Sequence, residues 1–256
     1  MASDTEPISL FKRFQDACSA ERLAPYKSGR SEIDALTLYA WNIALSEALY
    51  PSLQNLEIGL RNKIDTAVRV SYSDAQWFND PAIMVGFDER QSVEYAENRI
   101  VRRAEPVTPP AIVAELNFGF WSGLLRAEYD PTIWSRPNVI VQSFPYAQGH
   151  HRTRRNLFER FDQIRQLRNR VFHHDQIWHL DLKREHEKII ESLGWLDPSL
   201  QKVTKVLDRF PDVNTEQTKN RLKEQLMSAC PVETKVLLAS RREAEAAEEA
   251  SSDASE

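Results

Sequence analysis

The stretch RQLRNRVFHHDQIW, residues 165–178, decides how the rest of the sequence is interpreted. Its apolar residues continue the spacing of the segment before it, and a repeat of three and four residues indicates an amphipathic helix. The helix is expected to end near residues 173–175, with Ile177 and Trp178 anchoring the chain that leaves it. The repeat predicts a buried helix face made of Leu157, Phe161, Ile164, Leu167, Val171 and Phe172.

The same helical spacing dominates the rest of the 256-residue chain, and few stretches alternate with the period of two that is typical of strands. Seven glycines are few for a sheet-rich fold or for a loop that cradles a nucleotide. An apolar content of 41% is enough for one substantial core. We therefore predict an all-α protein with one large helical domain.

Arg168, Asn169 and His173 have the side chains that metal-independent phosphodiester cleavage needs. An imidazole can move a proton near neutral pH, a guanidinium can hold a phosphate through two hydrogen bonds, and an amide can orient either group. On a helix, Asn169 and His173 share a face, with Arg165 one turn before them. Arg168 points to one side, so Arg168 and His173 would flank a groove completed by a second helix or subunit. Alternatively, the arginines form a solvated face and the histidines lie at the helix C-terminus, where cations are favoured.

Three segments resemble one protein family. The motif LRNRVFHHDQIW is similar to the Arg-(Asn/Asp/His)-x-x-x-His signature of the Abi-like (abortive infection) branch of the HEPN superfamily. Two further segments fit the same branch: LQNLEIGLRNKI, residues 53–64, and VAELNFGFWSGLL, residues 113–125. The resemblance covers roughly residues 30 to 195 and implies a helical bundle that forms a homodimer.

The resemblance also implies an activity. Members of this branch are expected to cleave RNA without a metal, through attack of the ribose 2′-hydroxyl on the adjacent phosphate. The catalytic residues carried over are Arg168, Asn169 and His173. The implied role is antiphage abortive infection, with RNA as substrate, no cofactor, and an antitoxin or a phage-derived trigger as a further partner.

Glu57, Arg61 and Asn62 lie on a second amphipathic segment, and two interpretations stay open. Glu57 and Arg61 are four residues apart, which suits an intrahelical ion pair worth only a few tenths of a kcal/mol. The family resemblance instead favours a polar interior near the motif helix, in which Arg61 and Asn62 support RNA binding.

The segment His150–Arg170 concentrates basic residues, nearly all of them arginine. Arginine suits phosphate contacts better than lysine does, which predicts a track for the RNA backbone, although a solvated helix face is the alternative. His174 is expected either to stabilise the helix end or to contact RNA. The RNA-binding or supporting residues predicted here are Arg154, Arg155, Arg165, Arg170 and His174.

A second function is compatible with the same residues. A non-catalytic helical module that binds RNA or a partner protein within a phage-defence system would keep the arginines but would not need His173. A metal hydrolase using His173, His174 and Asp175 is a weaker option, because their spacing matches no usual zinc pattern. We therefore expect no metal site.

The overall charge and the chain ends set the remaining expectations. A formal net charge of −5 does not by itself indicate a nucleic-acid-binding protein, so that role must come from local clustering. Cys18 and Cys230 are expected to be reduced thiols, no apolar run is long enough for a membrane span, and residues 1–6 lack the features of a signal peptide. We expect a cytoplasmic protein without membrane contact.

The order of elements follows from turn residues and caps. We expect a first helix from about residue 8 that ends before Pro25, a second over 31–49, a break at Pro51, and a third to about residue 70. Further helices are predicted over 88–104, from Thr108 to about residue 124, over 150–172, over 183–192, from Asp197, and over 216–229. The domain boundaries expected are 1–30 for an N-terminal helix and loop, 31–240 for the Abi-like helical domain, and 241–256 for a disordered acidic tail.

Overall fold

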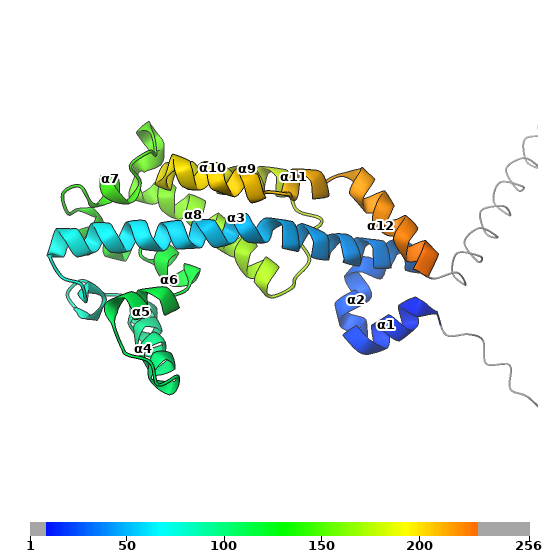
Figure 1. Cartoon of the computed structure of the whole chain (residues 1–256), viewed down its shortest axis with the longest axis horizontal. Helices are drawn as coiled ribbons and strands as arrows, with labels where there is room; N and C mark the ends of the chain where they lie inside the picture. The colour runs from blue at the N-terminus through cyan, green and yellow to red at the C-terminus, as the bar shows by residue number, and fades with distance from the viewer. Residues whose placement is uncertain (1–8, 230–256) are drawn as a thin grey trace, which may run out of the picture. The chain divides into compact units, whose positions relative to one another are not determined.

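The computed structural model describes residues 9–229, and in this part of the chain it contains twelve α-helices and no strand (Figure 1). The predicted all-α class is confirmed. The expected acidic tail, residues 241–256, and Cys230 lie outside the described residues. The α-helices are α1 Leu10–Cys18, α2 Ala20–Lys27, α3 Glu32–Tyr72, α4 Phe87–Arg102, α5 Pro109–Glu115, α6 Phe118–Gly123, α7 Val139–Ser143, α8 Arg154–Phe172, α9 Leu182–Leu196, α10 Pro198–Leu207, α11 Phe210–Val213 and α12 Glu216–Ala229.

The described chain forms two compact units. One contains residues 46–210, and the other combines residues 9–45 with residues 211–229. The two units divide inside α3 and inside α11, so they do not follow the sequence boundaries 1–30, 31–240 and 241–256. No helix among residues 9–229 is both long and apolar enough to cross a membrane.

The unit of residues 9–45 and 211–229 is held by aromatic packing and polar links. Tyr39 makes edge-to-face contacts with Phe14 and with Tyr26. The Trp41 indole donates a hydrogen bond to the carbonyl of Val213 at 3.0 Å.

The prediction of one helix ending before Pro25 is wrong, because the chain turns at Ser19, whose φ is +79°. The Ser19 side chain then caps α2, which continues through Pro25.

In the other unit, the second half of α3 contributes a continuous buried stripe. Pro51 does not break α3, contrary to the prediction from sequence. A proline inside a helix costs about 3 kcal/mol, whereas each fully buried leucine contributes about 1.5–3 kcal/mol. Burial on both sides of Pro51 therefore offsets its cost. Buried members of this stripe are Leu49, Leu53, Leu56, Leu60, Ile64 and Ala67.

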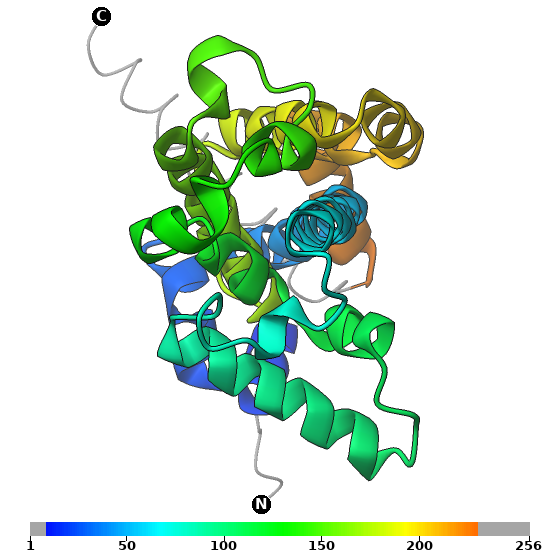
Figure 2. The ribbon, with the colours of Figure 1, turned by 90° about the vertical axis from the view of Figure 1, so that its left-hand side faces the viewer.

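Helices α4, α5 and α6 pack together beside η1, the 3-10 helix Trp77–Asn79 (Figure 2). Trp77 and Phe78 are buried. Thr108 caps α5 as expected, but the helix predicted to continue to about residue 124 is two helices. Its second part restarts at Asn117, whose side chain accepts a hydrogen bond from the Phe120 N–H at 3.1 Å. Val113, Leu116, Phe120 and Leu124 of this segment are all buried.

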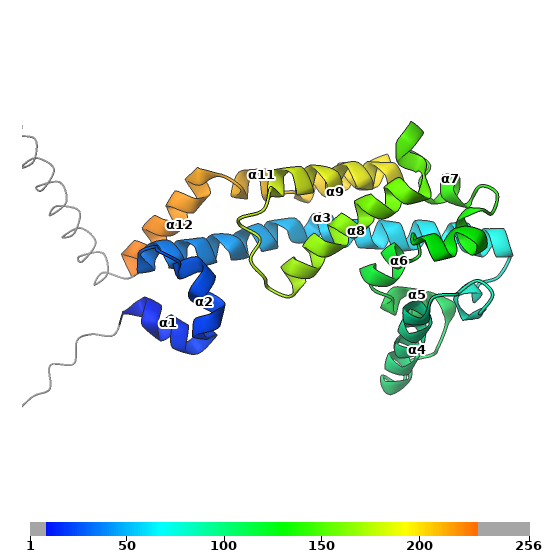
Figure 3. The same cartoon turned by 180° about the vertical axis from the view of Figure 1, so that it is seen from behind.

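Helix α8 packs against α6 on one side and α9 on another, and α9 in turn packs against α10 (Figure 3). The apolar stripe of α8 is buried as predicted, with the exception of Phe172, which is 37% exposed. Asp197 caps α10 and Pro198 occupies its first turn, as expected. The pKa of Asp197 is lowered by hydrogen bonds from the Ser199 hydroxyl and backbone and by the neighbouring Lys63.

Candidate functional site

The C-terminus of α8 carries the motif, and its backbone geometry fixes where the motif residues lie. His173 is the C-cap, and His174 follows with a φ of +60° in the left-handed region. The His174 N–H donates to the carbonyl of Val171 at 3.1 Å, and the Asp175 N–H donates to that of Arg170 at 2.8 Å. These two bonds form a Schellman motif, in which glycine is the usual residue at the left-handed position. The predicted helix end at residues 173–175 is therefore confirmed.

Arg168 is held by two neighbours. Its Nη2 donates to Glu57 Oε2 on α3 at 3.3 Å, and its guanidinium carbon lies 4.1 Å from the centroid of the Phe172 ring. The side chains of Arg168 and Glu57 are 21% and 22% exposed, so the pair is only partly shielded from water. The Nε of Arg168 is buried and has no hydrogen-bond partner in the described chain. A guanidinium has five N–H donors, so the contact with Glu57 leaves donors for a ligand.

His173 and Asn169 lie one turn apart on the same face of α8, as the sequence predicts. The His173 N–H donates to the carbonyl of Asn169 at 2.8 Å. The His173 side chain is exposed, and that of Asn169 is half-buried. Within residues 9–229, no hydrogen bond or ion pair joins Arg168 to His173. Arg168 and His173 thus lie at the same end of α8 and both reach solvent, but they do not contact each other through a hydrogen bond or an ion pair.

The neighbouring basic residues differ in how they are held. Arg165 makes two hydrogen bonds to Asp162 Oδ1, at 3.0 Å from Nε and 2.6 Å from Nη2, and Asp162 partly neutralises it. Arg170 is exposed, and His174 is exposed beside it in the Schellman motif. Arg170 and His174 are therefore more accessible to a ligand than Arg165 is.

The two arginines at the start of α8 both have partners within the chain but differ in exposure. Arg154 donates to the carbonyl of Leu125 at 2.8 Å, lies 3.8 Å from Asp130, and is only 19% exposed. Arg155 pairs with Glu159 at 3.0 Å on the surface. Arginine accepts such carbonyl and carboxylate partners readily because its fork of donors matches them. Arg154 therefore joins α8 to the loop after α6 and offers less surface to RNA than the sequence alone suggests.

Arg61 and Asn62 lie at a different place from the motif. Arg61 Nη1 donates to the carbonyl of Ala114 in α5 at 3.1 Å. The two side chains line a pocket of about 380 Å³ with Asp65 and Arg69, and its described lining includes no residue of α8. The expected intrahelical pair between Glu57 and Arg61 is wrong, because Glu57 pairs with Arg168. The alternative, a polar interior near the motif, is right for Glu57 but not for Arg61 and Asn62.

Sequence interpretation missed the aromatic surface beside Arg168. Tyr50 is 48% exposed and its ring lies 5.7 Å from that of Phe172, which was assigned to the buried face. A signal for Phe172 was present, because it follows Arg168 by four residues and therefore shares the face of Arg168. The position of Tyr50 depends on α3 remaining helical through Pro51, which the local pattern does not reveal.

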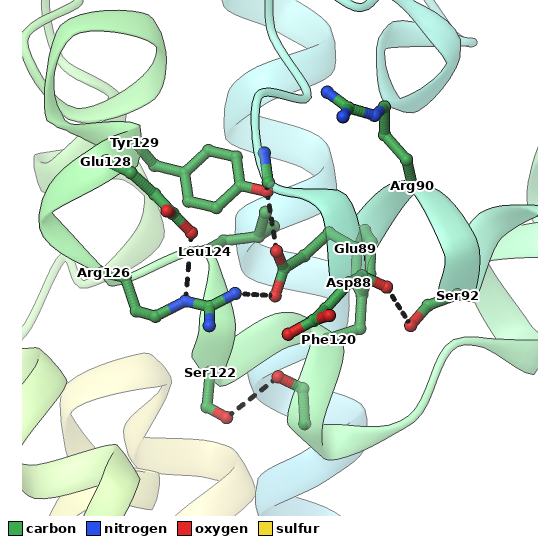
Figure 4. A network of polar contacts seen from close by, with 12 residues as sticks. Asp88, Glu89, Arg90, Ser92, Phe120, Ser122, Leu124, Arg126, Glu128 and Tyr129 are labelled. Atoms are coloured by element: carbon green, nitrogen blue, oxygen red, sulfur yellow. Dashed lines mark hydrogen bonds and ion pairs between the residues drawn. The ribbon is translucent and has the colours of Figure 1, made fainter.

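A second acid–arginine pair, in which the carboxylate is buried, lies in the same unit (Figure 4). Glu89 of α4 is only 4% exposed and forms an ion pair with Arg126, while the Tyr129 hydroxyl donates to its other oxygen at 3.0 Å. The Gly86 N–H donates to the Tyr129 hydroxyl at 3.1 Å. Burial, followed by the nearby Glu89 carboxylate, raises the pKa of Tyr129. Glu89 is buried by this network, while its neighbours Asp88 and Arg90 in the first turn of α4 are exposed.

Glycine provides the space for the Glu89 carboxylate. A Cβ at Gly86 or at Gly123 would clash with one of the two Glu89 carboxylate oxygens. The carboxylate thus occupies the space that a side chain at Gly123 would fill. In the part of the chain that the structure describes, no group of three or more His, Cys, Asp and Glu side chains is arranged to hold a metal ion.

Comparisons of the chain with models of protein families, with well-characterised proteins and with solved structures found no match.

Proposed function

We propose that this protein is a metal-independent endoribonuclease whose active site is the C-terminal end of α8. One observation carries the proposal: Arg168 and His173 both reach solvent at that helix end, and the Arg168 guanidinium is held between Glu57 and Phe172. A positioned guanidinium beside an exposed imidazole is a combination that can act on a phosphodiester at neutral pH.

The proposed reaction uses the RNA itself as nucleophile. The ribose 2′-oxygen attacks the adjacent phosphorus, and the His173 imidazole accepts the proton of the 2′-hydroxyl. The bond from phosphorus to the 5′-oxygen breaks, and a protonated imidazole supplies the proton to that leaving oxygen. The products are a 2′,3′-cyclic phosphate and a 5′-hydroxyl. The family resemblance implies a homodimer, in which His173 of the second copy can serve as the acid.

Arg168 and Asn169 have supporting roles in this reaction. The Arg168 donors that Glu57 does not use can bind the phosphate oxygens and offset the charge that grows on them. Glu57 fixes the guanidinium and lowers the net charge of the pair, so the phosphate must compete with a carboxylate at only one nitrogen. Asn169, on the same face as His173, can orient the imidazole or the phosphate.

The biological role that we propose comes from the resemblance of the motif segments to the Abi-like branch of the HEPN superfamily. RNA cleavage in an infected cell would stop phage production, and an antitoxin or a phage-derived trigger would control it. The proposed location is the cytoplasm, where the RNA substrate is found.

A second candidate function is a non-catalytic module that binds RNA or a partner protein in phage defence. The ion pair between Arg168 and Glu57 favours it, because a guanidinium already neutralised by a carboxylate attracts a phosphate less strongly. This module would need the exposed cations near residue 170 but would not need the imidazole of His173.

Incubation of the full chain with labelled RNA in EDTA separates the two functions. The nuclease cleaves RNA, leaves a cyclic phosphate, and does not cut an oligonucleotide of the same sequence that lacks 2′-hydroxyls. A single 2′-deoxy substitution at the cleaved nucleotide should stop cleavage there. Binding without cleavage would contradict the nuclease and support the module, and cleavage that EDTA stops would indicate a metal-dependent reaction.

A further inference from the structure

Two aromatic rings form an exposed surface beside the proposed phosphate-binding arginine. Tyr50 of α3 and Phe172 of α8 are 48% and 37% exposed, and we call this pair the aromatic shelf. Their ring centroids are 5.7 Å apart and their planes differ by 32°. Each ring therefore presents part of its surface to solvent while resting against the other.

The shelf is joined directly to the motif. The Arg168 guanidinium lies 4.1 Å from the Phe172 ring centroid, and the same arginine contacts Glu57, two turns after Tyr50 on α3. A group that can bind a phosphate is therefore adjacent to a surface that can stack a base. His173 follows Phe172 in the chain and begins the exposed turn beside it.

The exposed surface is aromatic but not generally apolar. Leu49 and Val171, the chain neighbours of the shelf residues, are buried, as is Leu53 one turn along α3. A surface that docks another protein through its apolar core usually exposes aliphatic side chains with the aromatic ones, whereas recognition of unpaired bases depends on aromatic rings and guanidinium planes. The exposed Arg170, next to the exposed imidazoles of His173 and His174, favours a polyanionic ligand.

We infer that the aromatic shelf stacks an unpaired base of single-stranded RNA next to the phosphate that Arg168 binds. This inference rests on the proposed RNA substrate and names its class: a single strand, or the loop of a folded RNA. Bases within an RNA duplex are already stacked and paired, so they cannot reach the rings without unpairing. The shelf thus selects unpaired RNA and sets which phosphate lies at the motif.

Binding measurements with the full-length His173→Ala protein test this inference without cleavage of the probe. The probes are a fluorescent unstructured RNA and a fully paired RNA duplex. Tyr50→Ala and Phe172→Ala should each weaken binding of the single strand by roughly ten-fold, because one stacked base contributes about 1–3 kcal/mol. Phe172→Trp should retain the affinity, and none of the three should change binding of the duplex by more than about two-fold. Tyr95→Ala, which removes a 60% exposed ring on α4, is the matched control and should bind as the parent does.

An RNA with a single abasic nucleotide at the stacked position gives a second measurement. The affinity of the parent for the abasic RNA should equal the affinity of Tyr50→Ala for the complete RNA. With the abasic RNA, Tyr50→Ala should cause no further loss of affinity. Equal binding of the complete RNA by Tyr50→Ala, Phe172→Ala and the parent would overturn the inference even if the parent cleaves RNA. A variant that changes the sedimentation of the protein but not its RNA affinity would also overturn it, because the shelf would then be a contact between two copies. If Tyr50→Ala and Phe172→Ala weaken RNA binding but the protein with His173 intact does not cleave RNA, the nuclease proposal is contradicted and the stacking inference is not.

Discussion

The unit of residues 46–210 contains two acid–arginine pairs that differ in what surrounds them. The Glu89 carboxylate is 4% exposed, accepts from both Arg126 and Tyr129, and fills a space made by two glycines. Glu57 is 22% exposed and meets Arg168 through one contact of 3.3 Å. The exposed rings of the aromatic shelf and the exposed turn after α8 lie next to the Glu57–Arg168 pair. Additional hydrogen bonds surround the Glu89 carboxylate instead.

The difference separates a structural role from a functional one. A buried carboxylate must keep its partners, since removing one leaves a group without compensation in a poorly solvated place. The Glu57–Arg168 pair is less enclosed than Glu89, so water and salt screen it more and its net value for stability is smaller. Arg168 can therefore exchange partners at small cost, while Arg126 cannot. We accordingly assign the Glu89 network to the fold and the Glu57–Arg168 pair to the site.

The largest effect on stability is expected from Glu89→Ala. This change removes the partner of Arg126 and the acceptor of the Tyr129 hydroxyl, and it should lower the free energy of unfolding by about 3 kcal/mol. Urea denaturation measures it. Glu128→Ala is the matched control, because Glu128 contacts the same arginine at 3.2 Å but is 44% exposed. An equal loss in the free energy of unfolding for both variants would show that the buried Glu89 stabilises the fold no more than the exposed Glu128 does.

A smaller effect is expected from Tyr129→Phe. Loss of the hydroxyl leaves the Gly86 N–H without its acceptor and should cost about 1–3 kcal/mol at neutral pH. Because the folded-state pKa of Tyr129 is raised above its unfolded value, its contribution is complete below about pH 10 and declines at higher pH. Denaturation between neutral and strongly alkaline pH should show a steeper loss of stability for the parent than for the variant, and parallel curves would contradict this.

At the open end of α8, His174→Gly should stabilise the protein slightly. The left-handed conformation costs a non-glycine residue about 1–2 kcal/mol, and the greater flexibility of glycine in the unfolded chain offsets about 0.5–1 kcal/mol of the relief. A rise of roughly 0.5–1 kcal/mol in the free energy of unfolding is expected from thermal or urea denaturation. A loss of stability would show that the His174 side chain contributes more than the strain costs. If His174 contacts RNA as predicted, the same variant should bind RNA more weakly.

The smallest stability change, under about 1 kcal/mol, is expected from Glu57→Gln. The variant keeps an oxygen acceptor for Arg168 and removes the negative charge that competes with a phosphate. The affinity for single-stranded RNA, measured in the His173→Ala background at low salt, should therefore rise several-fold, and the increase should shrink as salt is added. An unchanged or weaker affinity would mean that Arg168 does not meet the RNA backbone.

Much of this architecture could be predicted because each local signal agrees with the packing. Thr108, Asp197 and Pro198 mark helix starts that the structure retains, and the α8 stripe ends where its apolar spacing ends. Pro51 was misleading because its local penalty is smaller than the burial gained across the whole of α3. The split at Asn117 was missed because a side-chain cap can restart a helix inside an apolar pattern.

The site could be predicted in part. Arg168, Asn169 and His173 lie together because their spacing along a single helix fixes their relative positions. Arg154 and Arg61 could not be placed, since their partners are the carbonyls of Leu125 and Ala114, and no sequence pattern marks a backbone acceptor from another element. The aromatic shelf combines residues from α3 and α8, so only the tertiary structure brings it together.

The central claim is that the C-terminal end of α8, which carries Arg168 and His173, cleaves RNA. The most direct test is the rate of RNA cleavage in EDTA by the full-length variants His173→Ala and Arg168→Ala. Both variants should lose at least about 100-fold in rate while their circular dichroism and melting curves remain close to those of the parent, because the two side chains are exposed or only partly buried. Cleavage at the rate of the parent by both folded variants would contradict the account.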